Sequence, residues 1–134
     1  NARIEMVTRV EDGLLLRGDR PQLVSALFNL IDNAVKYSSP GAVVRITAAT
    51  TVGRIEMAVH DEGVGIPRRD LDRIFERFYR VDRARSRGTG GTGLGLAIVR
   101  HIANNHGGEV TVESTEGVGT TFTIWLPDPN REAR

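Results

Sequence analysis

The chain has 134 residues, the size of one domain with a core of its own. Hydrophobic residues make up 40% of it and charged residues 26%, which is typical of a globular protein. The formal net charge of +1 argues against a nucleic-acid partner bound through bulk electrostatics. Because the chain has no cysteine, disulfides, thiolate metal sites and a cysteine nucleophile are excluded.

No apolar run approaches the roughly 20 residues that a membrane-spanning helix needs, so we expect no direct membrane contact. No signal-peptide pattern is visible at the start of the sequence. Because the chain begins with Asn1 rather than Met, we interpret it as a fragment whose targeting elements lie upstream.

The first part of the chain predicts two short strands and a long helix. Residues 4–10 and 13–17 flank Glu11-Asp12-Gly13, a pattern that indicates a β-hairpin. A helix is expected from its N-cap residue Asp19 to about Tyr37, where the sequence Ser-Ser-Pro-Gly stops it.

The middle of the chain predicts two strands, at residues 43–49 and 55–59, followed by a long arginine-rich loop. Only residues 70–75 in that loop favour a short helix. Loops of this length in a compact domain are usually lids or binding loops, so we expect a lid over residues 62–92.

The last part predicts a helix at residues 94–106, ended by two glycines, then a hairpin with strands at 109–114 and 120–126. Residues 127–134 are expected to form a polar tail. We therefore expect one α+β domain over residues 1–134, a two-layer sandwich with helices on one face of a mixed, mostly antiparallel sheet.

The first helix has two distinct faces at about 100° per residue. One arc is apolar and is expected to pack on the sheet: Leu23, Leu27, Leu30, Ile31 and Ala34. The other arc is polar and gathers Asn29, Asn33, Lys36 and Tyr37.

The polar arc has the side chains that a nucleotide needs. Mg²⁺ prefers oxygen ligands and keeps waters and phosphate oxygens, so the amide oxygen of Asn33 can suffice as its protein ligand. Lys36 offers a point charge to phosphates, and Tyr37 can lie against a purine. The alternative is an ordinary amphipathic helix with a polar outer face.

The segment Asp61-Glu-Gly63-Val-Gly65-Ile66-Pro67 places a carboxylate at the end of a strand. A carboxylate only accepts hydrogen bonds, and the exocyclic amine of adenine donates them. Asp61 can therefore select adenine over guanine, and the two glycines let the backbone approach the base. The alternative is a plain turn.

Residues 88–95 contain five glycines and lead into a helix. The amides of residues 91–96 and the start of that helix suit phosphates, because helix N-termini favour anions. A flexible linker is one alternative. The match of residues 88–93 to a dinucleotide fingerprint is another, but no strand precedes it and no parallel strand is expected after the helix.

Together these motifs resemble the ATP-binding catalytic domain of bacterial sensor histidine kinases, with the Bergerat-type fold shared with gyrase, the Hsp90 chaperones and the MutL repair proteins. The resemblance extends from about Asp19 to Leu126. The four family motifs are matched by residues 29–37 (N box), 61–67 (G1 box), 75–80 (F box) and 91–96 (G2 box).

The resemblance implies a Mg²⁺ ligand at Asn33 and catalytic roles for Asn33, Lys36, Arg77 and Arg80, with one of the two arginines reaching the γ-phosphate. It implies that Thr121 supports the contact between Asp61 and adenine through water. The implied ATP contacts are Asn29, Asn33, Lys36, Tyr37, Asp61, Gly63, Gly65, Ile66, Gly91, Thr92, Gly93, Leu94, Gly95, Leu96 and Thr121.

Two departures from the related families refine the expected function. Gyrase-like hydrolases carry a glutamate base four residues before the metal asparagine, and here that residue is Asn29, which favours a kinase over a hydrolase. His60, His101 and His106 lack the context of the family's acceptor histidine, so we interpret them as structural or solvent-exposed. The chain should bind ATP without labelling itself.

The expected partners follow from the resemblance: a histidine-bearing dimerisation domain of the same kinase and a response regulator, in the cytoplasmic part of a membrane-anchored sensor. Phe75 and Phe78 are candidates for a docking edge, or they pin the lid to the core. The alternative functions are a non-catalytic nucleotide-binding or docking module and, less favoured, a dinucleotide-binding domain.

Overall fold

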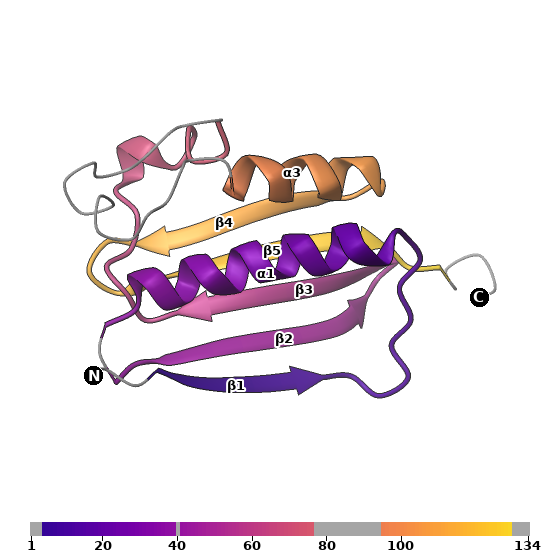
Figure 1. Ribbon diagram of the computed structural model, residues 1–134, viewed down its shortest axis with the longest axis horizontal. Helices are drawn as coiled ribbons and strands as arrows, with labels where there is room; N and C mark the ends of the chain where they lie inside the picture. Colours follow the sequence, from indigo (N-terminus) through magenta and orange to yellow (C-terminus); the bar gives the residue numbers. More distant parts are fainter. Residues whose placement is uncertain (1–3, 40, 77–94, 130–134) are drawn as a thin grey trace.

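The computed structural model describes residues 4–39, 41–76 and 95–129, which form a five-stranded sheet with two α-helices on one face (Figure 1). The strand order is β1-β2-β3-β5-β4, with β1 parallel to β2 and the other neighbours antiparallel. The predicted two-layer α+β class is thus confirmed. The elements are β1 (Glu5–Val10), α1 (Arg20–Tyr37), β2 (Val43–Thr51), β3 (Arg54–Asp61), the 3-10 helix η1 (Arg68–Asp70), α3 (Gly95–Asn105), β4 (Glu109–Thr115) and β5 (Gly119–Pro127).

The predicted hairpin at the start of the chain is wrong. Residues 13–17 form no strand, and β1 pairs in parallel with β2. Parallel neighbours need a crossover connection, and here α1 provides it. The turn after β1 is held to β2 by the carboxylate of Glu11, which accepts from the amide and the hydroxyl of Thr50 at 3.0 and 2.9 Å.

Helix α1 follows the prediction closely. Asp19 is its N-cap and accepts from the amide of Gln22 at 3.0 Å, while a proline occupies the first turn, where its missing N–H costs nothing. The predicted apolar arc faces the sheet: Leu23, Leu30 and Ala34 are buried, and Leu27 and Ile31 pack against the core from its margin. Ala26 is buried as well.

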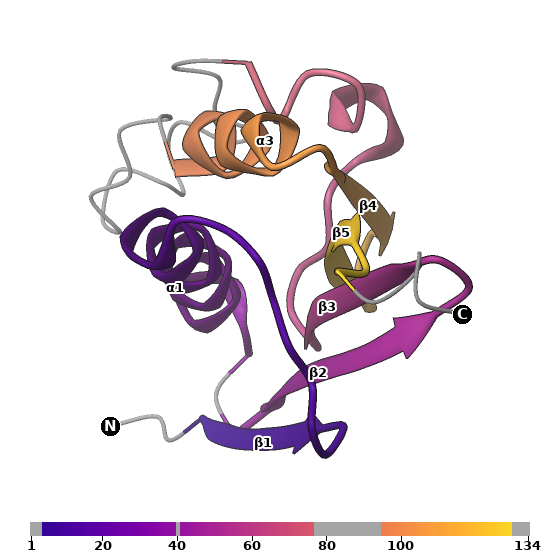
Figure 2. The ribbon, with the colours of Figure 1, turned by 90° about the vertical axis from the view of Figure 1, so that its right-hand side faces the viewer.

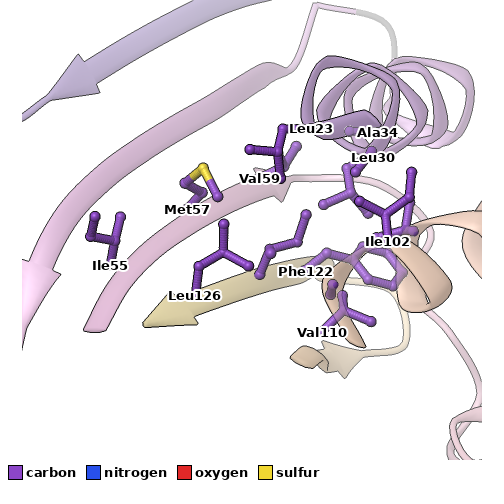
Figure 3. Close-up of a cluster of buried hydrophobic side chains, with 14 of the residues drawn as sticks. Leu23, Leu30, Ala34, Ile55, Met57, Val59, Ile102, Val110, Phe122 and Leu126 are labelled. Carbon is purple, nitrogen blue, oxygen red and sulfur yellow. The ribbon is translucent and has the colours of Figure 1, made fainter. Parts of the chain in front are cut away.

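The core fills the space between the helices and the sheet (Figure 3). The inward-facing side chains alternate along β3 and β5, as a strand with one covered face requires. The largest fully buried side chains are Phe122, Leu30, Ile55, Ile124, Leu126, Val44, Val59 and Val99. Figure 2 shows α1 and α3 side by side on the covered face, with β1 beyond them at the edge of the sheet.

The C-terminal part differs from the prediction only at its margin. The hairpin of β4 and β5 forms as expected, and Gly107 ends α3 with a φ of 81°. The predicted polar tail begins too early, however: Pro127 is the last residue of β5 and Asp128 is 2% exposed. The amide of Asp128 donates to Gly53 O at 3.1 Å, which ties the strand end to the β2–β3 turn.

The segment after β3 is mainly irregular where it is described. The helix predicted over residues 70–75 is replaced by η1 and by successive turns closed by hydrogen bonds between residues three apart, such as Arg73 N–H to Asp70 O at 2.9 Å. Residues 77–94, most of the predicted lid, lie outside the described residues. No helix in the described ranges is long and apolar enough to cross a membrane.

His106 connects the two helices. Its Nε2 accepts from the backbone amide of Asp19 at 3.0 Å, and its Nδ1 lies 2.8 Å from the carbonyl oxygen of Ile102. A Cβ at Gly18 would lie 2.3 Å from the imidazole ring, so the chain before α1 packs directly on this histidine. His106 is therefore structural, in line with the interpretation from the sequence.

We predict that His106→Ala destabilises the domain by about 1–2 kcal/mol, because it removes a hydrogen bond and the surface against which Gly18 packs. His101→Ala is the matched control, since His101 is exposed and its imidazole bonds only Asn105 on the same helix among the described residues. Urea denaturation measures both changes. Equal stabilities of the two variants would contradict the role of His106.

Candidate functional site

The predicted site residues that the structure describes gather at one end of the molecule. The C-terminal end of α1, the end of β3 and the beginning of β5 lie at this end (Figure 1). The first residue of α3 lies further back, beside Asn29 in the middle of α1.

Asp61 is the last residue of β3 and is 3% exposed. Its Oδ1 accepts from the amide of Gly63 at 3.0 Å. Burial raises the pKa of the Asp61 carboxyl, while hydrogen bonds from the amides of Gly63 and Thr120 and the nearby His60 oppose that shift. A buried carboxylate suits a ligand that donates hydrogen bonds.

Gly63 joins the Asp61 turn to the end of α1. A Cβ at this position would lie 2.1 Å from the carbonyl oxygen of Tyr37 and 2.9 Å from Oδ1 of Asp61. The amide of Val64 donates to the same Tyr37 carbonyl at 3.3 Å, and Ser38 forms a β-bridge with Gly63. Only glycine permits this approach, which brings Tyr37 beside Asp61.

Gly65 and Ile66 hold the same turn against the β4–β5 hairpin. Gly65 has a φ of 74°, and a Cβ there would lie 2.3 Å from the carbonyl oxygen of Thr115. The amide of Ile66 donates to the hydroxyl of Ser114 at 2.7 Å, and its side chain packs against the core. The predicted glycines are therefore needed for close backbone packing around Asp61.

Asn29 and Asn33 lie on one stripe of α1, because residues four apart share a helix face. The side-chain amide of Asn29 donates to Ser25 O at 2.8 Å, and its Oδ1 would be 2.9 Å from a Cβ at Gly95, the first residue of α3. With Tyr37 one further turn along, the stripe spans about 12 Å of helix between the start of α3 and the Asp61 turn.

Asn33 and Lys36 differ in their surroundings. The side chain of Asn33 is half buried and has no hydrogen-bond partner among the described residues, so its amide oxygen is available to a ligand. Lys36 forms an ion pair with Asp32, at 3.0 Å between Nζ and Oδ2. No group of three or more His, Asp or Glu side chains that could hold a metal is found in the described ranges.

The structure does not bring Thr121 to Asp61. Its hydroxyl lies 2.6 Å from Nδ1 of His60, on the face of the sheet away from the helices. The residue directly opposite Asp61 is Thr120, which is 4% exposed and shares its face. Strand alternation could have identified it, since Phe122, two residues on, was an obvious core position.

Several predicted site residues fall outside the described residues: Arg77, Arg80, Gly91, Thr92, Gly93 and Leu94, together with Phe78 of the suggested docking edge. Gly95 and Leu96 lie in the first turn of α3. Phe75 packs edge-on against the buried ring of Phe122, with ring centroids 6.0 Å apart, which favours the alternative that it pins the lid segment to the core.

Comparison with protein families covers nearly the whole chain. Residues 18–130 match the model of the histidine kinase-, DNA gyrase B- and HSP90-like ATPases. The sensor-like histidine kinase SenX3 of Mycolicibacterium smegmatis is 49% identical over 128 residues, covering 96% of this chain and 33% of the relative. The sensor histidine kinase WalK of Bacillus subtilis is 43% identical over 129 residues, covering 92% and 21%. The chain thus spans a third or less of these curated relatives.

Solved structures agree on the fold. The mycobacterial sensor histidine kinase MprB aligns with a TM-score of 0.80 and 35% identity, covering 92% of this chain and 81% of that one. Full-length ShkA in complex with AMPPNP aligns with a TM-score of 0.78 and 34% identity, covering 92% and 25%. The dinucleotide-binding alternative finds no support, because α3 leads into an antiparallel hairpin instead of a parallel strand.

The pKa of Asp61 gives a signed prediction. Because the folded-state pKa lies above the ordinary value of 3.8, the folded chain holds the proton more tightly than the unfolded chain does. The resulting stability is present at low pH and is lost as the pH rises through the folded pKa. We expect the free energy of unfolding of the wild type, relative to Asp61→Asn, to fall as the pH rises from the ordinary pKa of 3.8 through the raised pKa of the folded state.

Chemical denaturation of the two proteins at several pH values measures this difference, and the other carboxyl groups cancel in it. Glu62→Gln is the control, because Glu62 is the next residue in the chain and its carboxylate is exposed, whereas that of Asp61 is buried. A difference that stays constant or grows with pH would show that burial does not raise the pKa of Asp61.

Proposed function

The chain belongs to the family of histidine kinase-, DNA gyrase B- and HSP90-like ATPases, and we propose that it binds Mg·ATP and supplies the γ-phosphoryl group to a histidine on a separate domain. The observation that carries this proposal is the buried Asp61 carboxylate, which lies beside Tyr37 at one end of the α1 stripe; the other end, at Asn29, lies beside the start of α3. The site residues that follow are part of the proposal.

Asp61 selects the base. Its ionised carboxylate accepts from the exocyclic amine of adenine, and guanine, with a carbonyl oxygen at the equivalent position, would place an acceptor against it. Tyr37 flanks the base at the end of α1, and the backbone of Gly63, Gly65 and Ile66 closes around it. AMPPNP bound by the similar kinase ShkA is an adenine nucleotide, which supports this choice of base.

Asn33 holds the metal ion. Its side chain is half buried and bonds no described residue, and an amide oxygen is the hard donor that Mg²⁺ prefers. When bound, Mg²⁺ neutralises the charge of the phosphate oxygens during transfer. Asn33 adds no negative charge that would repel those phosphates, and Lys36 adds a positive one.

The start of α3 holds the phosphates. The amides of Gly95 and Leu96 lie in its first turn, where N–H groups have no partner within the helix. We extend this cradle to Gly91, Thr92, Gly93 and Leu94, which precede α3 directly. Arg77 and Arg80 are our candidates for the γ-phosphate.

The surroundings of Asn29 favour a kinase over a hydrolase. A neutral amide here cannot take a proton from water, so hydrolysis is slow and the phosphoryl group is kept for another acceptor. We exclude the described histidines as that acceptor, since His60 and His106 bond Thr121 and Asp19, and the sequence around His101 lacks the context of the family's acceptor.

The acceptor therefore belongs to another domain. The relatives named above are sensor histidine kinases of which this chain spans only part, which supports a histidine-bearing dimerisation domain and a response regulator as partners. We place the chain in the cytoplasmic part of such a sensor, as a single domain with a lid near residues 62–92. A nucleotide-binding module without phosphoryl transfer is the remaining alternative.

We predict that the chain binds ATP in calorimetric titrations, more tightly with Mg²⁺ than without it, and discriminates against GTP and NAD. Asp61→Asn should weaken ATP binding by about 10–100-fold, since it removes a charge-assisted hydrogen bond in a buried site. Glu62→Gln, which alters an exposed neighbouring carboxylate, should leave the affinity within about twofold. Binding of ATP that is indifferent to Asp61 would refute the site.

We further predict that the chain labels a histidine-bearing dimerisation domain from γ-labelled ATP but does not label itself. Asn33→Ala should lower the labelling rate by about 100-fold, because the metal loses its protein ligand. Asn105→Ala, which removes an exposed amide from α3, is the control. Unchanged labelling by Asn33→Ala would sink the metal role, and ATP binding without any labelling would favour the non-catalytic module.

A further inference from the structure

The hydroxyl of Ser114 on β4 is the centre of a hydrogen-bond network beside Asp61. Its Oγ lies 2.7 Å from the amide nitrogen of Ile66. It also lies 3.0 Å from the carbonyl oxygen of Gly119 and 2.8 Å from Oγ1 of Thr120. The loop after β3, strand β4 and the start of β5 therefore meet at one half-buried hydroxyl.

The chemistry of these partners fixes the direction of each bond. The amide of Ile66 can only donate, and the carbonyl of Gly119 can only accept. The hydroxyl of Ser114 therefore donates its one hydrogen bond to the carbonyl oxygen of Gly119. In the bond between the two hydroxyls, Thr120 is then the donor and Ser114 the acceptor. Thr120 then has only lone pairs to offer to another neighbour.

Thr120 lies next to Asp61 on the neighbouring strand, on the same face of the sheet. The two residues are directly paired in the register of β3 and β5, and both are almost fully buried. Side chains in such pairs have their Cβ atoms about 4.5–5.5 Å apart, close enough for one ligand to meet both. Because ionised Asp61 also only accepts, the pair presents acceptors and no donor.

We propose that Ser114 is a positioning residue for base selection, an inference that rests on the proposed binding of ATP. Because Ser114 accepts the hydrogen bond of the Thr120 hydroxyl, the Asp61–Thr120 pair has no donor left for a ligand. Such a pair suits the exocyclic amine of adenine and rejects the carbonyl oxygen of guanine. Ser114 acts through Thr120 and through the backbone of Ile66, without touching the nucleotide.

Replacing Ser114 by alanine removes the acceptor for the hydroxyl of Thr120. That hydroxyl can then donate a hydrogen bond to the carbonyl oxygen of guanine. We expect Ser114→Ala to weaken ATP binding and to narrow the ratio of the GTP and ATP dissociation constants by about tenfold. Ser114→Thr keeps the hydroxyl and should retain the ratio. Thr111→Ala removes a hydroxyl from the opposite face of the same strand and is the matched control.

Titration calorimetry with both nucleotides at neutral pH measures the ratio, and thermal unfolding of each variant reports its stability. A ratio that Ser114→Ala leaves unchanged, including equal weakening of both nucleotides, would overturn the inference, because a purely structural defect affects ATP and GTP alike. If Ser114→Ala does not fold, Ser114→Cys decides, since a thiol is a poor acceptor and should also narrow the ratio. A wild type that binds no ATP would instead overturn the proposed function.

Discussion

A carboxylate buried inside a domain has to be met by hydrogen-bond donors, and the loop after β3 is built around this requirement. Asp61 receives the amide of Gly63 at 3.0 Å, while the same glycine lies so close to Tyr37 that a Cβ would be 2.1 Å from its carbonyl oxygen. Gly63 thus orients the carboxylate of Asp61 and also holds the last turn of α1 in place. The stripe of amides on α1 is placed relative to this junction.

This arrangement works against stability. Burial raises the pKa of Asp61, whereas an apolar residue, such as Val59 on the same face of β3, would pack there without a charge to solvate. Large buried side chains fill the covered face of the sheet, among them Ile55 and Phe122 (Figure 3). The adenine contact that we propose gives this buried carboxylate a function.

The elements that sequence reasoning predicted correctly are those with a strong local period. Helix α1 shows the 3.6-residue pattern and a cap at Asp19, and β3 alternates throughout. The hairpin at residues 13–17 was wrong because a local turn signal says nothing about β2, the parallel partner that β1 reaches only after α1. Thr121 lies on the other face of β5 from Asp61, because successive side chains in a strand point to opposite faces.

Asn29 links the chemistry of the site to its architecture. Its side-chain amide donates to Ser25 O at 2.8 Å, which leaves Oδ1 against Gly95 at the start of α3. A carboxylate at this position could not donate to that carbonyl and would be repelled by it, so it would have to turn away. The residue beside the start of α3, the helix to which we assign the phosphates, is therefore one that cannot act as a base for water. In the function that we propose, such a site keeps the phosphoryl group for transfer and does not lose it to hydrolysis.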